Sequence, residues 1–509
     1  MEQADFERVA ASFAAFHAEF APLFGRVEAQ QRSEQYVRGL LVQQADRRNA
    51  ENVAEMIEGA TPRTLQRLLT EAPWPTDPVI NRLQAYVGAR LNAPDGVFVI
   101  DESGFPKQGI KSVGVGRQYC GTLGKVGNCQ LGVFLSYASV RGHALVDTRL
   151  YLPQAWVDDP ARCRAAGVPE GAIRYQSKAE LALDLLRQAR AAGHLTGPWV
   201  AGDDAYGMVP TLRDALDAED WRYVLDVPAT TPVFDQPALA EVPPWSGRGA
   251  KPTKPRLAPD AAPARTAAAI AAGLSARVWQ DLTVAEGAQG LRTYQFAAVR
   301  VWESRDGLPG RACWLLLRRN LDGSESRYYL SNAPEDTPLL TLAQVAAARW
   351  TIETEFETAK GETGLDEYEV RGWPGWHHHL TLALLAGAFL LTVQQDWGKK
   401  DALAHPSASQ PGAPRDAAPP PVDACGVAPV AHRHPRAQCP RQTLPHQTTP
   451  PQAVCRLIFT TRRLIRRCST SEAPPQTDES CVVCIEKAPG CGHKRSTVHR
   501  LHEDRRAVK

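Results

Sequence analysis

The pattern of apolar and polar positions divides the chain into segments of different period. Over residues 1–95 apolar residues recur at helical spacing, as at Phe13, Phe16 and Phe20. We therefore expect a helical N-terminal domain over residues 1–95. Such a domain serves stability alone or binds DNA, and its charge does not decide between the two. Its candidate phosphate-binding residues are Arg26, Arg32, Arg38, Arg47 and Arg48.

From residue 96 the pattern becomes that of buried strands. An apolar run over residues 96–100 ends at Asp101, and a second run over residues 198–202 ends at Asp203. Short, wholly apolar runs are typical of strands that are covered on both faces. Their alternation with helical segments predicts an α/β domain with a mixed sheet, whose first part spans residues 96–227.

The next segments have different characters. A Pro/Ala/Gly-rich stretch and three β-like runs predict a β-rich insertion over residues 228–335. Helical spacing returns over residues 336–397, the second part of the domain. Its longest apolar run, residues 380–393, is too short to span a bilayer. We expect a buried helix there and no membrane partner.

Residues 398–509 do not resemble a folded domain. They hold 15 of the 40 prolines and 7 of the 11 cysteines, and no Trp or Tyr. Such a composition cannot bury enough apolar surface to offset chain entropy. We interpret this tail as a frame-shifted gene end. A genuine disordered tail is one alternative, and a small zinc module is another, because Cys481, Cys484, Cys491 and His493 have partly zinc-like spacing.

Overall charge adds little to this picture. The net charge is only +2, so no global basic field indicates a nucleic-acid partner. The first ten residues are acidic and lack the apolar core of a secretory signal peptide. We therefore expect a cytoplasmic protein whose cysteines stay reduced.

Three acidic positions are candidates for chemistry. Asp101 and Asp203 follow buried strands, whose ends meet at one edge of an α/β sheet. Two carboxylates without nearby Cys or His suit Mg²⁺ or Mn²⁺ better than zinc. An aspartate after a strand is also common as a turn or cap. Glu353 shares a helix face with Arg349 and Lys360, which fits either a site or a solvated face with ion pairs.

The motifs around these positions resemble those of DDE insertion-sequence transposases, especially the insertion sequence 701 family. The segments DESGFPKQG from Asp101 and WVAGDDAYG from Trp199 are similar to two catalytic blocks of that family. Glu353 has Arg349 four residues before it and Lys360 seven after it, as in the signature helix of the related IS-four-like transposases. The tyrosine of that signature is Ala346 here. The resemblance covers roughly residues 10–395.

The resemblance implies an RNase H-like catalytic core with a β-rich insertion, preceded by the helical domain. It implies that Asp101, Asp203 and Glu353 are catalytic and bind two Mg²⁺ or Mn²⁺ ions. Asp204 competes with Asp203, but the Asp-x-x-Tyr-Gly register favours Asp203. The implied activity is cleavage at terminal inverted repeats and strand transfer into target DNA. A homodimer, located in the cytoplasm on the nucleoid, would perform it.

Basic residues near the acids are predicted to contact DNA phosphates, although each is equally explained as a surface charge. They are Lys107, Lys111, Arg117, Lys125, Arg349 and Lys360. We expect Trp373 and Trp376 in the core rather than stacked on a base, and the three histidines at 377–379 in polar or DNA-facing positions. Two alternative functions are an inactive DNA-binding remnant of a transposase and an RNase H-like cellular nuclease.

Overall fold

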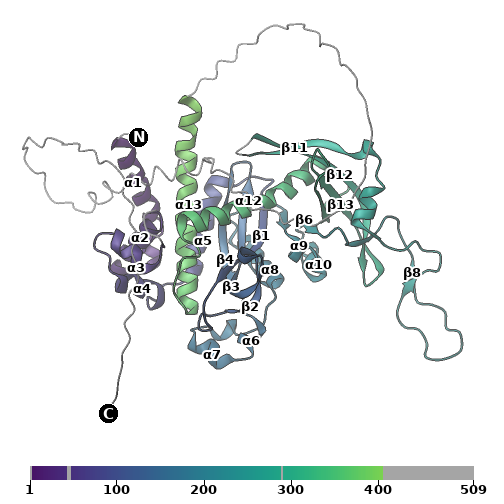
Figure 1. Cartoon of the computed structure of the whole chain (residues 1–509), viewed down its shortest axis with the longest axis horizontal. Helices are drawn as coiled ribbons and strands as arrows, with labels where there is room; N and C mark the ends of the chain where they lie inside the picture. Colours follow the sequence, from purple (N-terminus) through teal and green to yellow (C-terminus); the bar gives the residue numbers. More distant parts are fainter. Residues whose placement is uncertain (1–2, 43–46, 288–289, 405–509) are drawn as a thin grey trace, which may run out of the picture. The chain divides into compact units, whose positions relative to one another are not determined.

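The computed structural model describes residues 3–42, 47–287 and 290–404 (Figure 1). Among these residues the main feature is a twelve-stranded mixed sheet. Helices pack around this mixed sheet, so the predicted α/β class is confirmed. The predicted zinc-like cysteines and most of the tail lie outside the described residues.

Five strands form the centre of this sheet, in the order β6-β5-β1-β3-β4. β3 pairs antiparallel with both β1 and β4, whereas β5 is parallel to β1 and to β6. The apolar start of β1, Val97 to Ile100, is fully covered because helices pack on both faces. These strands are β1 (Val97–Pro106), β3 (Lys125–Ser139), β4 (Gly142–Leu150), β5 (Trp199–Gly202) and β6 (Arg222–Val227).

A short hairpin extends β3 at its N-terminal end. β2 (Gly116–Cys120) pairs antiparallel with β3, and the 3₁₀ turn η2 (Gly121–Leu123) joins the two strands. Cys120 and Cys129 are buried beneath the hairpin together with Leu131. This small apolar cluster fixes the hairpin to the sheet.

Most strands of the predicted insertion belong to the twelve-stranded sheet and do not form a sheet of their own. β14 pairs antiparallel with β6, so the same sheet continues outward through β13 and β12. Apolar side chains from these strands and from α11 make a second, smaller core. The strands are β7 (Pro232–Phe234), β10 (Arg265–Thr266), β11 (Gln280–Gly287), β12 (Gly290–Arg305), β13 (Leu308–Arg319) and β14 (Ser326–Ser331), with β8 (Ala240–Glu241) and β9 (Arg256–Leu257) as a separate pair.

Residues 3–91 form five α-helices in the described structure. Thr61 caps α4 through the Thr64 amide, and Pro62 occupies its first turn, where no amide hydrogen is needed. Tyr36 and Tyr86 make hydrogen bonds to His379 and Thr392, which ties this segment to the second half of the chain. The helices are α1 (Gln3–Ala18), α2 (Val27–Leu40), α3 (Ala50–Met56), α4 (Pro62–Thr70) and α5 (Thr76–Leu91), with η1 at Ala21–Phe24.

The remaining helices cover the sheet or connect its strands. α8 begins with a capping box between Ser177 and Glu180. The long ones are α8 (Lys178–Ala192), α10 (Pro210–Ala218), α12 (Leu339–Thr363) and α13 (Trp373–Ala404). The short ones are α6 (Gln154–Val157), α7 (Pro160–Ala165), α9 (Asp204–Gly207) and α11 (Ala267–Ala272), with η3 at Glu170–Ala172 and η4 at Ala276–Val278.

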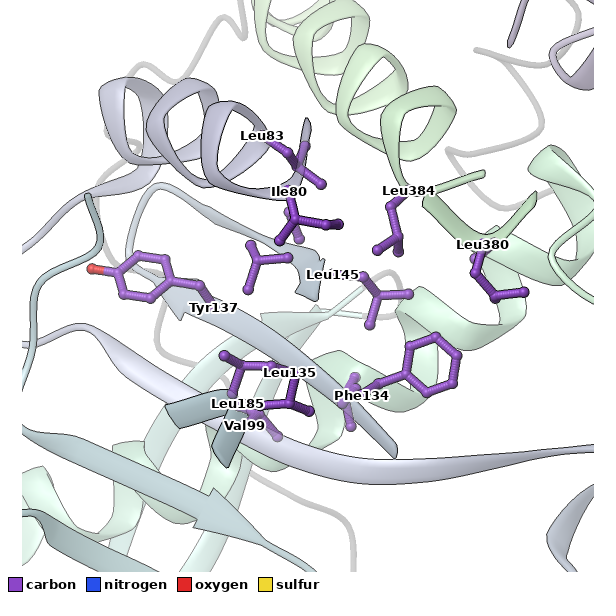
Figure 2. Packing of buried hydrophobic residues seen from close by; sticks show 14 of the residues in the cluster. Ile80, Leu83, Val99, Phe134, Leu135, Tyr137, Leu145, Leu185, Leu380 and Leu384 are labelled. Atoms are coloured by element: carbon purple, nitrogen blue, oxygen red, sulfur yellow. The ribbon is translucent and has the colours of Figure 1, made fainter. Parts of the chain in front are cut away.

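Helix α13 is the apolar helix that the sequence predicts. It is long and apolar enough to cross a membrane, but 89% of its apolar window is buried inside the protein. Figure 2 shows Leu384 of α13 and Ile80 of α5 on the same side of Leu145 of β4, and all three belong to one buried cluster. The prediction of a buried core helix is therefore confirmed. The helix runs to Ala404, somewhat beyond the predicted end of the domain.

Candidate active site

Asp101 and Asp203 lie side by side because β1 and β5 are parallel and in register. Ile100 is opposite Gly202, and each aspartate directly follows its member of this pair. Asp101 is buried, and the Glu102 amide donates a hydrogen bond to its Oδ1 at 2.7 Å. Asp203 accepts from the Ala205 amide at 3.1 Å, as the cap of α9. The predicted proximity of two carboxylates at one edge is therefore present.

Strand β1 itself is longer than expected. The sequence predicts that it ends at Asp101, but it continues to Pro106 because β3 keeps pairing with it as far as Cys129. Asp101 is therefore an interior residue of a long strand. Asp203 does follow the end of its strand, as predicted.

The two carboxylates are difficult to ionise together. The pKa of Asp101 is raised to about 8, mainly by burial and in addition by the negative charge of Asp203. Burial also raises the pKa of Asp203 to about 6, helped by the charge of Glu102 and opposed by Arg349. Desolvation and repulsion of this kind are typical of carboxylates that bind a cation.

Arg349 of α12 is the cation that faces these acids. Its Nη1 donates to Glu353 Oε1 at 2.8 Å, and its Nε lies 3.9 Å from Asp226 Oδ2. Burial disfavours its charge, but Asp226, Asp101, Glu353 and Asp203 together raise the pKa of Arg349. One guanidinium thus partly neutralises four carboxylates.

Asp226 is a member of this group that the sequence patterns did not reveal. It lies within β6, next to β5, and burial raises its pKa to about 7. Arg349 is the largest opposing influence on that pKa. A signal existed, since an acid inside an apolar strand is rare unless it is paired.

Glu353 is linked to the two aspartates indirectly, because it forms an ion pair with Arg349, which in turn faces Asp101 and Asp203. Its side chain is 42% exposed and forms the i,i+4 ion pair with that arginine. In the described part of the chain, no group of three or more His, Cys, Asp or Glu is arranged to hold a metal ion. The structure therefore brings Asp101 and Asp203 together, while a contact of Glu353 with them stays a prediction.

The donor set nevertheless fits a hard divalent cation. Carboxylate oxygens are the ligands that Mg²⁺ and Mn²⁺ prefer. The raised pKa values of Asp101 and Asp203 show that a positive charge between them would be favourable. Glu353 would have to exchange its ion pair with Arg349 for such a cation.

Three neighbouring acids are exposed or have other partners, although the charge of Glu102 still raises the pKa of Asp203. Glu102 points to the opposite face of β1 and forms an ion pair with Lys178 of α8. Glu355 is buried and accepts hydrogen bonds from Ser136 at 2.9 Å and from His143 at 2.8 Å. Asp204 is exposed. None of the three interacts with Arg349 in the way that Asp203 and Asp226 do.

The residue after the Asp-x-x-Tyr stretch, Gly207, lies too close to β6 for any side chain to fit. A Cβ at this position would lie 1.8 Å from the Asp226 carbonyl oxygen. We expect Gly207→Ala to lower the free energy of unfolding by about 1–3 kcal/mol, because α9 must move away from β6. Urea denaturation would measure this loss. Gly171→Ala is the control, since its Cβ would meet nothing within 4 Å, and equal losses in both variants would contradict the account.

The predicted DNA-binding residues occupy three kinds of position. Lys111, Arg117 and Lys125 are exposed on or beside the β2–β3 hairpin. Lys360 donates from Nζ to Thr122 Oγ1 at 3.0 Å. Lys107 lies over the Tyr368 ring at 3.6 Å, and burial lowers its pKa to about 8. Lys107 is therefore half-buried and less available to a phosphate than the other residues.

Other candidates are part of the core. Arg48 is buried and forms an ion pair with Glu367, which favours a structural role for this arginine. Trp376 is fully buried, as predicted for a core residue. His378 and His379 are buried as well, with ring nitrogens bonded to backbone carbonyl groups. A DNA-facing position is therefore wrong for His378 and His379, because both are buried, whereas His377 is half-buried and bonded to the Trp373 carbonyl group.

A family model and solved structures are similar to this chain. A family model described as DDE superfamily endonuclease matches residues 19–291, which is more than half of the chain. The match includes Asp101 and Asp203 and ends before Glu353. No curated protein matches in sequence. A solved piggyBac transposase, in a synaptic complex with hairpin DNA, is similar with 9% identity and a TM-score of 0.34, over 73% of this chain and 67% of that one.

Proposed function

This chain belongs to the DDE superfamily endonuclease family, and from that membership we propose that it is a DNA transposase of the insertion-sequence kind. It would cleave double-stranded DNA at the terminal inverted repeats of its element and join the freed ends to target DNA. Two copies would pair the two ends. The single observation that carries this proposal is the in-register pair of Asp101 and Asp203 beneath Arg349.

The carboxylates of Asp101, Asp203 and Glu353 would hold the divalent ions, with Mg²⁺ or Mn²⁺ as the suitable metals. When bound, a pair of such ions would activate the attacking oxygen and stabilise the leaving one. The insertion sequence 701 family is the subfamily that the motifs favour. A location in the cytoplasm, on the nucleoid, belongs to the same proposal.

The chemistry consists of two displacements at phosphorus. In the first, the oxygen of water forms a bond to the scissile phosphorus while a bridging P–O bond breaks, which leaves a 3′-hydroxyl. In the second, that 3′-hydroxyl attacks a target phosphodiester, so one P–O bond replaces another and no external energy source is needed. Positioning and electrostatic stabilisation are what a protein contributes to such reactions.

Residues around the carboxylates would supply that positioning. Arg349 is charged at any physiological pH and lies at the acids, where its guanidinium suits two phosphate oxygens. Asp226 would orient Arg349 through the contact between Oδ2 and Nε. Lys360 and the exposed cations of the hairpin would bind phosphates farther from the cut.

A cleavage assay with the DNA that flanks the gene tests the proposal. The full chain is incubated with Mg²⁺ and a labelled duplex that contains the candidate inverted repeat, and the products are separated by denaturing electrophoresis. We expect cuts at the repeat end and none in a shuffled duplex. Equal cutting of both duplexes would indicate a general nuclease instead. Binding without cutting would indicate an inactive remnant.

A further inference from the structure

We propose that one face of the β2–β3 hairpin binds the bases of locally unpaired DNA next to the cleavage position. This face, called the hairpin face below, consists of Arg117, Tyr119 and Val126. The inference rests on the proposed function, and it names the form of DNA that the site would accept. It adds an apolar and aromatic contact to the phosphate contacts considered above.

The strand register places these side chains together. Tyr119 is directly opposite Val126, so the two share one face of the hairpin, and Arg117 shares it because it is two residues away. Tyr119 is 62% exposed and Val126 54%. An aromatic and an aliphatic side chain exposed side by side, with a cation next to them, form a small apolar patch that can receive a ligand.

Side-chain hydrogen bonds fix the hairpin on both of its faces. Gln118 donates to the Cys129 carbonyl at 3.0 Å, over the buried cluster of Cys120 and Cys129. Asn128 donates to the carbonyl groups of Lys107 and Gly109, both at 2.8 Å. The hairpin face is therefore presented on a preorganised support, which lowers the entropy cost of binding.

The hairpin also lies close to the candidate active site. Thr122 donates to the Gly104 carbonyl at 2.8 Å, and Lys360 donates to Thr122 at 3.0 Å. Gly104 is three residues beyond Asp101 on β1, and Lys360 is seven residues beyond Glu353 on α12. These separations correspond to roughly 10 Å along the strand and the helix. DNA that reaches the acids would thus pass the hairpin face.

The charge around this face identifies the partner. No aspartate or glutamate occurs from residue 103 to residue 146. Lys111, Arg117 and Lys125 are exposed there and make no ion pair with any residue that the structure describes. A second copy of the same face would be repelled by these like charges, whereas a polyanion is attracted.

The apolar groups restrict the form of the DNA. Tyr119 and Val126 gain nothing from phosphates, but aromatic rings stack on unpaired bases and aliphatic side chains insert between separated ones. In a fully paired duplex the base faces are covered. The hairpin face therefore fits a DNA segment whose bases are unpaired, and the cations beside it fit the backbone of that segment.

Fluorescence anisotropy with two probes tests this inference. One probe is a labelled 30-base-pair duplex, and the other is the same duplex with three central mismatches and a 2-aminopurine in the mismatched segment. We expect the full chain to prefer the mismatched probe and to quench the 2-aminopurine. Tyr119→Ala should reduce that preference at least about fivefold, the lower end of the loss for one stacked base. Tyr119→Phe should retain it.

Two further variants separate the contributions. Arg117→Ala should weaken binding of both probes alike and lower its salt dependence, as expected for a phosphate contact. Tyr175→Ala is the matched control, since Tyr175 is also an exposed tyrosine at 48% but lies on another loop. It should leave the preference unchanged.

Each other outcome has a defined meaning. If the wild-type chain binds neither probe, the proposed function and this inference fail together. If it binds DNA but Tyr119→Ala keeps the full preference, only this inference is overturned. A change of oligomeric state in Tyr119→Ala, measured by light scattering, with an unchanged preference would show that the face binds protein and would also overturn it.

Discussion

Replacing Asp203 by asparagine is expected to slow DNA cleavage by on the order of 10²–10³-fold or more, because an amide cannot supply the charge that holds a divalent ion. Asp101→Asn and Glu353→Gln should have effects of similar size. Single-turnover cleavage of the inverted-repeat duplex in Mg²⁺ would measure them. The double variant of both aspartates should cost little more than either one, since the residues act as a unit.

Matched controls lie beside each acid. Asp204 is exposed next to Asp203, and Glu357 is exposed on the same helix as Glu353. Asp204→Asn and Glu357→Gln should leave the cleavage rate within about twofold, as is usual for exposed substitutions. A large loss of rate in Asp204→Asn together with a small loss in Asp203→Asn would show that Asp204, and not Asp203, is the metal ligand.

The stability of the metal-free protein should fall as the pH rises from about 4 to about 8. The folded state raises the pKa of Asp101 from 3.8 to about 8, so in this window the folded chain holds a proton that the unfolded chain has lost. Stability therefore decreases with pH, and Asp203 adds to the same slope up to about 6. Urea denaturation at several pH values in the presence of EDTA would measure this slope.

Asp101→Asn removes the cause of this slope and should therefore stabilise the metal-free protein. At neutral pH we expect a gain on the order of 1–3 kcal/mol in the free energy of unfolding, and almost none at pH 4. Added Mg²⁺ should raise the thermal midpoint of the wild type but not of the variant, because ligand binding to the folded state adds stability. A variant that is less stable than wild type at pH 8 without metal would contradict the electrostatic account.

The relation between sequence and structure differs from residue to residue. The neighbouring positions of Asp101 and Asp203 could be predicted, because wholly apolar runs indicate adjacent buried strands, although β1 continues past Asp101 to Pro106. The mutual position of Arg349 and Glu353 follows from helical spacing alone. These local patterns carry their own geometry, and the structure contains both pairs.

Other features depend on pairing partners that no local pattern specifies. A period of two predicts strands in the insertion but not that β14 pairs with β6 and extends the central sheet. The place of Asp226 in the site could not be predicted for a related reason. It depends on the pairing of β6 with β5 and on Arg349, which is distant in the sequence. The burial of His378 could not be predicted either, because the carbonyl groups of Leu69 and Trp74 that bond to its ring come from a distant part of the chain.

The most direct test of the account is the position of Mn²⁺ in a crystal of the full chain bound to inverted-repeat DNA. Anomalous scattering locates manganese independently of the surrounding protein. The account predicts anomalous peaks within bonding distance of carboxylate oxygens from Asp101, Asp203 and Glu353, with the Arg349–Glu353 ion pair opened. Manganese bound elsewhere, or bound to the two aspartates while Glu353 stays on Arg349, would contradict the claim that these three acids form one metal site.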